Sequence, residues 1–297
     1  MGDVSTGTSV ASEARNEPLD SRRPGACTVL WFRFQTAVPQ SPRFHPRSTH
    51  TRNRSRRRTV AAWGAYLAPN GYPSRGGSLP HMNAVLFDMD GVLVNSEDYW
   101  TTFQREEILP AAVPDRDVDV AEVTGMNYRE TYDYLESEYG TAISREAFET
   151  RFEETAREIY REHVDLLDGL EGVLEQLDER GVAAAVVSSS PHAWIDIVLE
   201  RFDLEGTFDE VVSAEEIDAR GKPAPDVFEH AASEVGVAPE DCAVVEDSEN
   251  GVAAGARAGG FVVAYRIDAH DDLDLSPADA IVDSPAELRE AVLEAVD

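Results

Sequence analysis

The chain has 297 residues, a length that fits one large domain or two moderate ones. Hydrophobic residues make up 42%, enough for an ordinary core, and the formal net charge is −31. This charge is uneven, because residues 1–81 carry twelve arginines against four acids and sum to +8, which leaves −39 for residues 82–297. Such a charge excludes binding of nucleic acid or of an anionic membrane through the bulk field of residues 82–297.

Lysine is nearly absent from the chain. Lys222 is the one lysine, and arginine supplies the other 25 basic residues. A highly acidic chain tolerates its own repulsion best in concentrated salt, where the Debye length falls to about 3 Å. We therefore expect a halophilic, cytoplasmic protein.

This composition predicts a response to salt. Raising KCl from dilute buffer to molar concentration should raise the thermal unfolding midpoint and the activity, because screening reduces the repulsion among the acids. Circular dichroism melts across a KCl series measure the effect. A protein that is fully folded and active in dilute buffer, and that gains nothing from KCl, would contradict the halophilic assignment.

The cysteines and the hydropathy argue against a disulfide-rich protein and against a membrane-spanning one. Cys27 lies in the basic N-terminal region and Cys242 in a predicted buried strand, so we expect no disulfide framework. No apolar run approaches the roughly 18–20 residues that a membrane span requires.

Residues 1–81 differ from the rest of the chain. They are rich in Ser, Pro, Gly and Arg, include RNRSRRR at 52–58 and show no sustained periodicity. One interpretation is a transit peptide, although the prolines argue against it. The others are a disordered basic arm and an extension outside the working protein, with Met82 as the natural start. The abrupt change in composition at Met82 favours the last of these.

The first predicted strand leads directly into acidic residues. The apolar stretch Ala84 to Phe87 is followed by Asp88, Asp90 and Gly91, as expected for a buried parallel strand with a turn at its carboxyl end. Ser96 is then the predicted N-cap of a helix. The helical patterns in this part, with no strand among them, are Ser96 to Leu109, Tyr128 to Tyr139 and Ser144 to Val164.

From Gly169 onward, predicted strands and helices alternate. They are helix Leu170 to Glu179, strand Val182 to Val187, helix Pro191 to Phe202 with Pro191 at its first position, strand Phe208 to Val212, helix Asp226 to Val235, strand Cys242 to Val245, helix Asn250 to Ala258, strands Phe261 to Ala264 and Ile281-Val282, and helix Pro285 to Val296. Alternation of this kind indicates βαβ units. The predicted fold is therefore α/β: a doubly wound parallel-sheet (Rossmann-like) core of residues 82–95 and 168–297, with an all-helical cap domain of residues 96–167 inserted.

Polar side chains stand at the carboxyl ends of the predicted strands. They are Asp88 and Asp90, Ser188, and Glu246 with Asp247, to which the turn Gly221-Lys222-Pro223 adds an ammonium. In open α/β sheets ligands bind at these ends, so the side chains should converge. Carboxylates hold divalent cations such as Mg²⁺, while a hydroxyl and an ammonium hold anionic oxygens. The alternative for Ser188, Glu246 and Asp247 is that each caps the helix that follows it.

Four motifs together resemble, in order, those of the haloacid dehalogenase-like phosphohydrolases. They are Asp88-Met-Asp90-Gly91-Val92-Leu93, Ser188 after a strand, Gly221-Lys222-Pro223 and Glu246-Asp247-Ser248. The resemblance covers residues 83–297, and the helical insert is similar to the small cap of the branch that contains phosphoglycolate phosphatases and β-phosphoglucomutases. It implies an Mg²⁺-dependent phosphatase that hydrolyses a small phosphate monoester, of the phosphoglycolate or sugar phosphate type, through an aspartyl-phosphate intermediate. We expect a monomer or a small homo-oligomer.

The resemblance also implies roles for the acids. Asp88 attacks phosphorus, and Asp90 protonates the leaving alkoxide and then deprotonates the attacking water. The ligands of Mg²⁺ are Asp88, the backbone carbonyl of Asp90 and Asp247, with Glu246 in support.

The remaining implied roles concern the negative charge of the substrate. Ser188 and Lys222 neutralise the phosphate oxygens that are not transferred, because an anionic nucleophile approaching a phosphate needs cationic charge nearby. The position of the only lysine supports this independently, since an ammonium is a compact charge that arginine does not reproduce. Arg129, at the start of a cap helix, is either a contact for a second anionic group of the substrate or a solvated helix charge.

Other functions compete with the phosphatase. True dehalogenases lack an acid two residues after the nucleophile, so Asp90 favours phosphoryl transfer. β-Phosphoglucomutases tend to use a cap lysine and a histidine near the position of Trp100; both are absent here, which leaves a mutase as the alternative. A phospho-signalling receiver also combines acids, a hydroxyl and Lys-Pro around Mg²⁺, but the long helical insert between Asp88 and Ser188 does not fit one.

Overall fold

The structure is a computed structural model that describes residues 81–217, 220–267 and 273–297. Cys27 and the predictions for residues 1–80 lie outside the described residues. Within those residues, no helix is long and apolar enough to cross a membrane.

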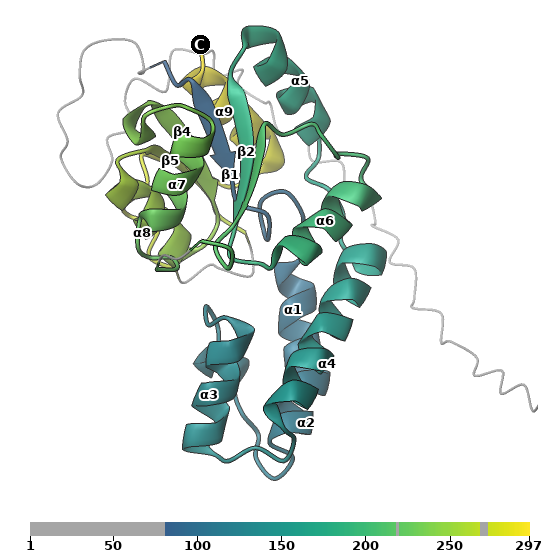
Figure 1. Cartoon of the computed structure of the whole chain (residues 1–297). Coiled ribbons are helices and arrows are strands. Elements are labelled where there is room, and N and C mark those ends of the chain that lie inside the picture. The colour runs from purple at the N-terminus through teal and green to yellow at the C-terminus, as the bar shows by residue number, and fades with distance from the viewer. Residues whose placement is uncertain (1–80, 218–219, 268–272) are drawn as a thin grey trace, which may run out of the picture. The chain divides into compact units, whose positions relative to one another are not determined.

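The described residues form six strands and the helices between them (Figure 1). The strands are β1 Ala84–Phe87, β2 Ala183–Ser188, β3 Glu210–Ser213, β4 Cys242–Glu246, β5 Phe261–Tyr265 and β6 Ala280–Val282. The α-helices are α1 Glu97–Phe103, α2 Leu109–Ala112, α3 Tyr128–Glu138, α4 Arg145–Glu158, α5 Leu170–Arg180, α6 His192–Arg201, α7 Asp226–Glu234, α8 Glu249–Ala258 and α9 Pro285–Ala295. The shorter turns are η2 Gln104–Ile108 and η4 Ile159–His163, which are π-helical, and the 3-10 turns η3 Val120–Glu122 and η5 Pro239–Asp241.

The strands form one parallel sheet in the order β3-β2-β1-β4-β5-β6. β1 lies at the centre, where Phe87 is opposite Val186 of β2 and Val245 of β4. The chain adds strands to one side of β1 and then returns to add β4 on the other side, so the topological switch point lies between β1 and β4. This arrangement confirms the predicted α/β doubly wound fold and places the ends of β2, β1 and β4 side by side.

Two apolar layers hold the helices on the sheet, because successive residues of a strand point to opposite faces. Val85 and Phe87 of β1 pack in one layer with α5, α6 and α9. Ala84 and Leu86 pack in the other layer with α7 and α8, and Figure 1 shows this last pair together on one face of the sheet. The central strand is therefore covered on both faces, and its carboxyl end is the part left for chemistry.

Residues Glu97–His163, between β1 and β2, contain only helices among their regular elements, and we call them the helical insertion. Their apolar side chains continue the layer of α5 and α6: Phe148, Phe152 and Tyr160 are all buried in it. This content agrees with the all-helical segment expected from the sequence. Its status as a separate cap domain with bounds 96–167 stays a prediction.

One predicted helix start is wrong by one residue, and another lacks the capping contact that its pattern suggests. Ser96 is the N-cap of α1 as predicted, but it makes no capping hydrogen bond, because its hydroxyl donates instead to Oδ1 of Asp90, 2.5 Å away. A bond to a carboxylate is stronger than a neutral cap, and the turn at Gly91 brings the two side chains together. Pro191 precedes α6 as its N-cap rather than being its first residue, since its ψ of 144° is extended.

Candidate active site

The central feature of the site is an ammonium between two carboxylates. Lys222 Nζ lies 2.5 Å from Oδ1 of Asp88 and 2.6 Å from Oε1 of Glu246, and it also donates to the backbone carbonyl of Val187 at 3.2 Å. Burial lowers the pKa of Lys222, but Asp88 and Glu246 outweigh it and the net pKa is raised, so the side chain stays an ammonium. One lysine thus joins the ends of β1, β2 and β4.

Three buried carboxylates gather around this ammonium. Oxygen atoms of Asp88, Glu246 and Asp247 lie within 4.8 Å of one another. When ionised they carry three negative charges against one positive charge on Lys222, which leaves an excess of two. Burial raises the pKa of Asp88 well above its ordinary value, Lys222 opposes the rise, and Glu246 and Asp247 add to it. A divalent cation with hard oxygen ligands fits this set, because it balances the charge and favours the ionised forms.

Close backbone approach makes room for the carboxylate of Asp247. Gly91, in the turn after Asp90, has a φ of +73°, and a Cβ there would lie 2.1 Å from Oδ2 of Asp247. A side chain at position 91 would therefore suffer both backbone strain and overlap with a carboxylate. The glycine of the first motif is needed because Asp247 occupies the space beside it.

Glu246 is held by donors on both of its oxygens. Oε1 accepts from Lys222, while Oε2 accepts from the backbone N–H groups of Asp247 and Ser248 at 3.1 and 3.2 Å and from the Ser248 hydroxyl at 2.9 Å. A Cβ at Gly251, in the first turn of α8, would lie 1.8 Å from Oε1. Since these donors occupy its oxygens, Glu246 is better suited to orienting Lys222 than to binding a metal directly. Ser248, rather than Asp247, caps α8.

Asp90 accepts three hydroxyl hydrogen bonds. Ser96 and Tyr160 donate to Oδ1 at 2.5 and 2.8 Å, and Ser190 donates to Oδ2 at 2.9 Å. Desolvation is the main cause that raises the pKa of Asp90; Glu97 adds to the rise, and the three hydrogen bonds oppose it. A carboxyl whose pKa is raised toward neutral pH suits proton transfer in both directions.

Ser188 is the last residue of β2 and is buried. Its Oγ accepts from the backbone N–H of Ser190 at 3.0 Å, and no side-chain hydrogen bond caps α6. The alternative that Ser188 caps this helix is therefore wrong. Its hydroxyl hydrogen is available to a further acceptor beside β1, because Ser188 uses only its oxygen in this contact.

Arg129 forms its ion pair with Glu215 and not with one of the other predicted site residues. Its Nη1 is 2.5 Å from Oε1 of Glu215, which follows β3, and its guanidinium lies 4.5 Å from the ring centre of Tyr128. The alternative of a solvated helix charge does not account for this ion pair, which joins the helical insertion to the residues that follow β3. About half of the Arg129 side chain is exposed, so this ion pair contributes little to stability.

The family model of the haloacid dehalogenase-like hydrolases matches residues 82–259, more than half of the chain. The chain belongs to this family. The matched residues contain all four predicted motifs and the helical insertion. The family match confirms the prediction that the chain is a hydrolase.

Relatives of this hydrolase include enzymes of phosphate-ester chemistry. It is 30% identical over 173 residues to hexitol phosphatase B of Escherichia coli K12, which covers 58% of this chain and 78% of the relative. It is 31% identical over 193 residues to β-phosphoglucomutase of Bacillus subtilis 168, covering 61% and 82%. A haloacid dehalogenase-family hydrolase of Deinococcus radiodurans R1, solved with bound phosphate and sodium, has 31% identity and a TM-score of 0.56, covering 73% of this chain and 97% of that one.

Three side chains of the hydrolase site were not predicted from the sequence. Ser96, Tyr160 and Ser190 all donate to Asp90, although the predicted elements place them at a helix N-cap, within a helix and between a strand and a helix. Ser190 and Tyr160 are 100 and 70 residues from Asp90 in the sequence, so local spacing carries no information on these contacts. Only Ser96, six residues after Asp90, lies near enough for a motif to include it.

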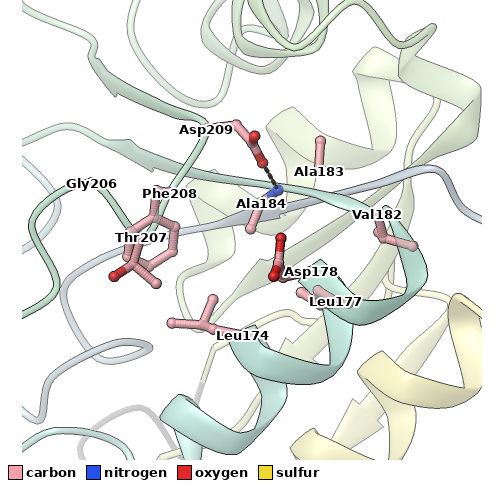
Figure 2. Close-up of a pocket in the computed structure, with 11 residues that line it drawn as sticks. Leu174, Leu177, Asp178, Val182, Ala183, Ala184, Gly206, Thr207, Phe208 and Asp209 are labelled. Carbon is pink, nitrogen blue, oxygen red and sulfur yellow. Dashed lines mark hydrogen bonds between the residues drawn. The ribbon is translucent and has the colours of Figure 1, made fainter.

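A separate hollow of about 300 Å³ lies at the other end of β2 (Figure 2). Leu174, Leu177 and Phe208 line it, and the carboxylate of Asp209 accepts a hydrogen bond from the backbone N–H of Ala184 at 2.9 Å. It borders the first residues of β2, whereas the carboxylates and Lys222 lie at the strand's last residues. The acids and Lys222 therefore make the carboxyl ends of the strands, and not this hollow, the candidate active site.

Proposed function

We propose that this hydrolase is an Mg²⁺-dependent phosphatase that releases phosphate from a small phosphate monoester through an aspartyl-phosphate intermediate. The observation that carries the proposal is the buried cluster in which Lys222 bridges Asp88 and Glu246 beside Asp247. A nucleophilic carboxylate, a fixed ammonium and a set of oxygen ligands are the groups that phosphoryl transfer requires.

The proposed metal ligands are carboxylate oxygens of Asp88 and Asp247 and the backbone carbonyl of Asp90, with Glu246 in a supporting position. When bound, the ion supplies positive charge that offsets the repulsion between a carboxylate and a phosphate. Glu246 acts through Lys222, since donors hold both of its oxygens.

Asp88 is the proposed nucleophile. One of its oxygens forms a bond to phosphorus while the bond from phosphorus to the ester oxygen breaks, and Asp90 delivers its proton to the departing alkoxide. Water then attacks the aspartyl-phosphate, Asp90 takes a proton from that water, and the bond between phosphorus and Asp88 breaks. Asp90 ends each cycle protonated, as it began.

Lys222 and Ser188 are the proposed ligands of the phosphate oxygens that are not transferred. Lys222 is fixed by two carboxylates and is 6% exposed, so it needs little rearrangement to meet a negative charge. Ser188 lies on the neighbouring strand and can donate its hydroxyl hydrogen.

The proposed substrate class is a sugar phosphate or a small phosphorylated acid. The names of the relatives support the sugar phosphate, because they include a hexitol phosphatase and a β-phosphoglucomutase. Arg129 is the proposed contact for a second anionic group of the substrate. That group would replace Glu215 as the ion-pair partner of Arg129. The cytoplasmic location and the monomeric or small homo-oligomeric state stay predictions.

A phosphomutase is the second candidate, favoured by the 31% identity to β-phosphoglucomutase. Against it stands the lack of any lysine in the helical insertion, since Lys222 is the only one in the chain.

The full-length chain in molar KCl with Mg²⁺ should release phosphate steadily from one group of substrates. The panel contains phosphoglycolate, glycerol phosphates, hexitol and hexose phosphates and β-glucose 1-phosphate, and both free phosphate and hexose-phosphate isomers are measured. Isomer formation with little free phosphate would replace the phosphatase by the mutase. A single stoichiometric phosphorylation without turnover would point to a receiver.

A further inference from the structure

We propose that Tyr160 is a positioning residue for Asp90, and that it sets which carboxylate oxygen transfers the proton. This inference rests on the proposed function, because it assigns a role within the proton transfers of that reaction. Tyr160 belongs to η4, which follows α4 at the end of the helical insertion, and it is fully buried.

The contact with Trp100 indicates the direction of the hydrogen bond between Tyr160 and Asp90. Nε1 of Trp100 lies 3.1 Å from the Tyr160 hydroxyl, which lies 2.8 Å from Oδ1 of Asp90. An indole N–H can only donate, so the tyrosine oxygen accepts from Trp100 and its own hydrogen is directed at Asp90. While Asp90 is ionised, the hydrogen bonds therefore run in one direction, from the Trp100 indole to the Tyr160 hydroxyl and from that hydroxyl to the Asp90 carboxylate.

Groups from different parts of the chain fix the position of Tyr160. The guanidinium of Arg201, on α6, donates to the backbone carbonyl of Tyr160 at 2.8 Å. The rings of Trp100 and Trp194 lie 6.1 and 6.2 Å from the ring of Tyr160, centre to centre. Tyr160 is thus held by α1 of the helical insertion and by α6 of the sheet portion together.

The two oxygens of Asp90 are consequently not equivalent. Among the residues that the structure describes, Oδ1 accepts from both Ser96 and Tyr160, whereas Oδ2 accepts from Ser190. A proton on Oδ1 would disrupt two bonds, while the Ser190 hydroxyl can rotate when Oδ2 is protonated. Oδ2 is therefore the atom that gives its proton to the alkoxide and later takes one from water. Removing the Tyr160 hydroxyl frees the carboxyl to rotate and makes the oxygens more alike.

The test compares Tyr160→Phe with wild-type enzyme and with Tyr132→Phe. The control removes another hydroxyl of the helical insertion, one that donates to the carbonyl of Ile143. With an alkyl phosphate, Tyr160→Phe should lower kcat by about tenfold or more, a part of the 10²–10⁴-fold typical of general acid–base catalysis, with KM changed less than about twofold. Tyr132→Phe should match wild type.

p-Nitrophenyl phosphate provides a readout that a merely structural role would not change. Its leaving group needs no proton, so Asp88 attack proceeds in Tyr160→Phe while the Asp90-assisted attack of water is slow. A burst of nitrophenol equal to the enzyme concentration should appear in Tyr160→Phe and be smaller in wild type. Wild-type kcat in the variant, without a burst, would overturn the inference.

A second variant keeps the test decisive if Tyr160→Phe does not fold. Trp100→Phe removes the indole N–H that orients the tyrosine hydroxyl, so it should show a smaller fall in kcat with KM unchanged. If Trp100→Phe folds and keeps wild-type kcat, the chain from Trp100 to Asp90 has no positioning role. Wild-type enzyme that releases no phosphate from any ester would instead overturn the proposed function, and this inference with it.

Discussion

Asp88→Asn is expected to abolish phosphate release while the fold stays intact. An amide cannot form the acyl phosphate, so turnover should fall by at least about 10⁴-fold, the scale on which removal of a nucleophile acts. The fold should tolerate the change for two reasons. Burial disfavours a charge at this position, as the raised pKa of Asp88 indicates, and the amide is neutral. Lys222 also keeps Glu246 as its partner. We expect the thermal unfolding midpoint to stay within about 4 °C of wild type.

The matched control for this prediction is Asp117→Asn, an identical change at an exposed acid of the helical insertion. Its phosphate release should equal that of wild type. Intact-mass measurement verifies that residue 88 remains an amide in the assayed sample. Mg²⁺-dependent turnover by such a sample would show that Asp88 is not the nucleophile.

Lys222→Met is expected to remove activity and most of the stability together. Methionine fills a similar volume but leaves Asp88, Glu246 and Asp247 without their ammonium. Removing one partner of a buried ion pair costs about 3–5 kcal/mol, because the remaining charge stays desolvated and unpaired. Urea unfolding should show this loss, and turnover should fall below detection because no ammonium meets the phosphate oxygens.

Added Mg²⁺ tests whether the carboxylates left unpaired in Lys222→Met bind a metal ion. If the carboxylates bind Mg²⁺, millimolar MgCl₂ should raise the unfolding midpoint of Lys222→Met more than that of wild type, since the ion then supplies the missing charge. Matched ionic strength from KCl controls for screening. No response of either protein to Mg²⁺ beyond that of the KCl control would argue against metal binding by these carboxylates.

The fold was predictable from the sequence because each strand carries an unambiguous pattern. Short apolar runs such as Ala84 to Phe87 and Cys242 to Val245 alternate with helices, and this admits few arrangements other than a parallel sheet. The meeting of Asp88, Lys222 and Glu246 was predictable for the same reason. All three stand after or at the ends of strands or in the connecting turns, where topology alone determines proximity.

The environment of Asp90 could not be predicted in this way. Tyr160 lies within the predicted helix Ser144 to Val164, and helical periodicity does not show where its hydroxyl is directed. Ser96 satisfies the pattern of an N-cap, and the pattern does not show that a carboxylate competes for the hydroxyl. The partner of Arg129 is likewise a matter of packing between the helical insertion and the turn after β3.

The solitary buried lysine limits how this protein can be modified and handled. Among its side chains, Lys222 is the only amine, and it is 6% exposed in the folded protein. Acylation, cross-linking or attachment of a label through lysine would therefore either fail or modify the proposed catalytic centre. A lysine-specific protease has one cleavage position in the chain. Covalent tags must use other residues, and the reaction of Lys222 with an amine-directed reagent would report on solvent access to its buried ammonium.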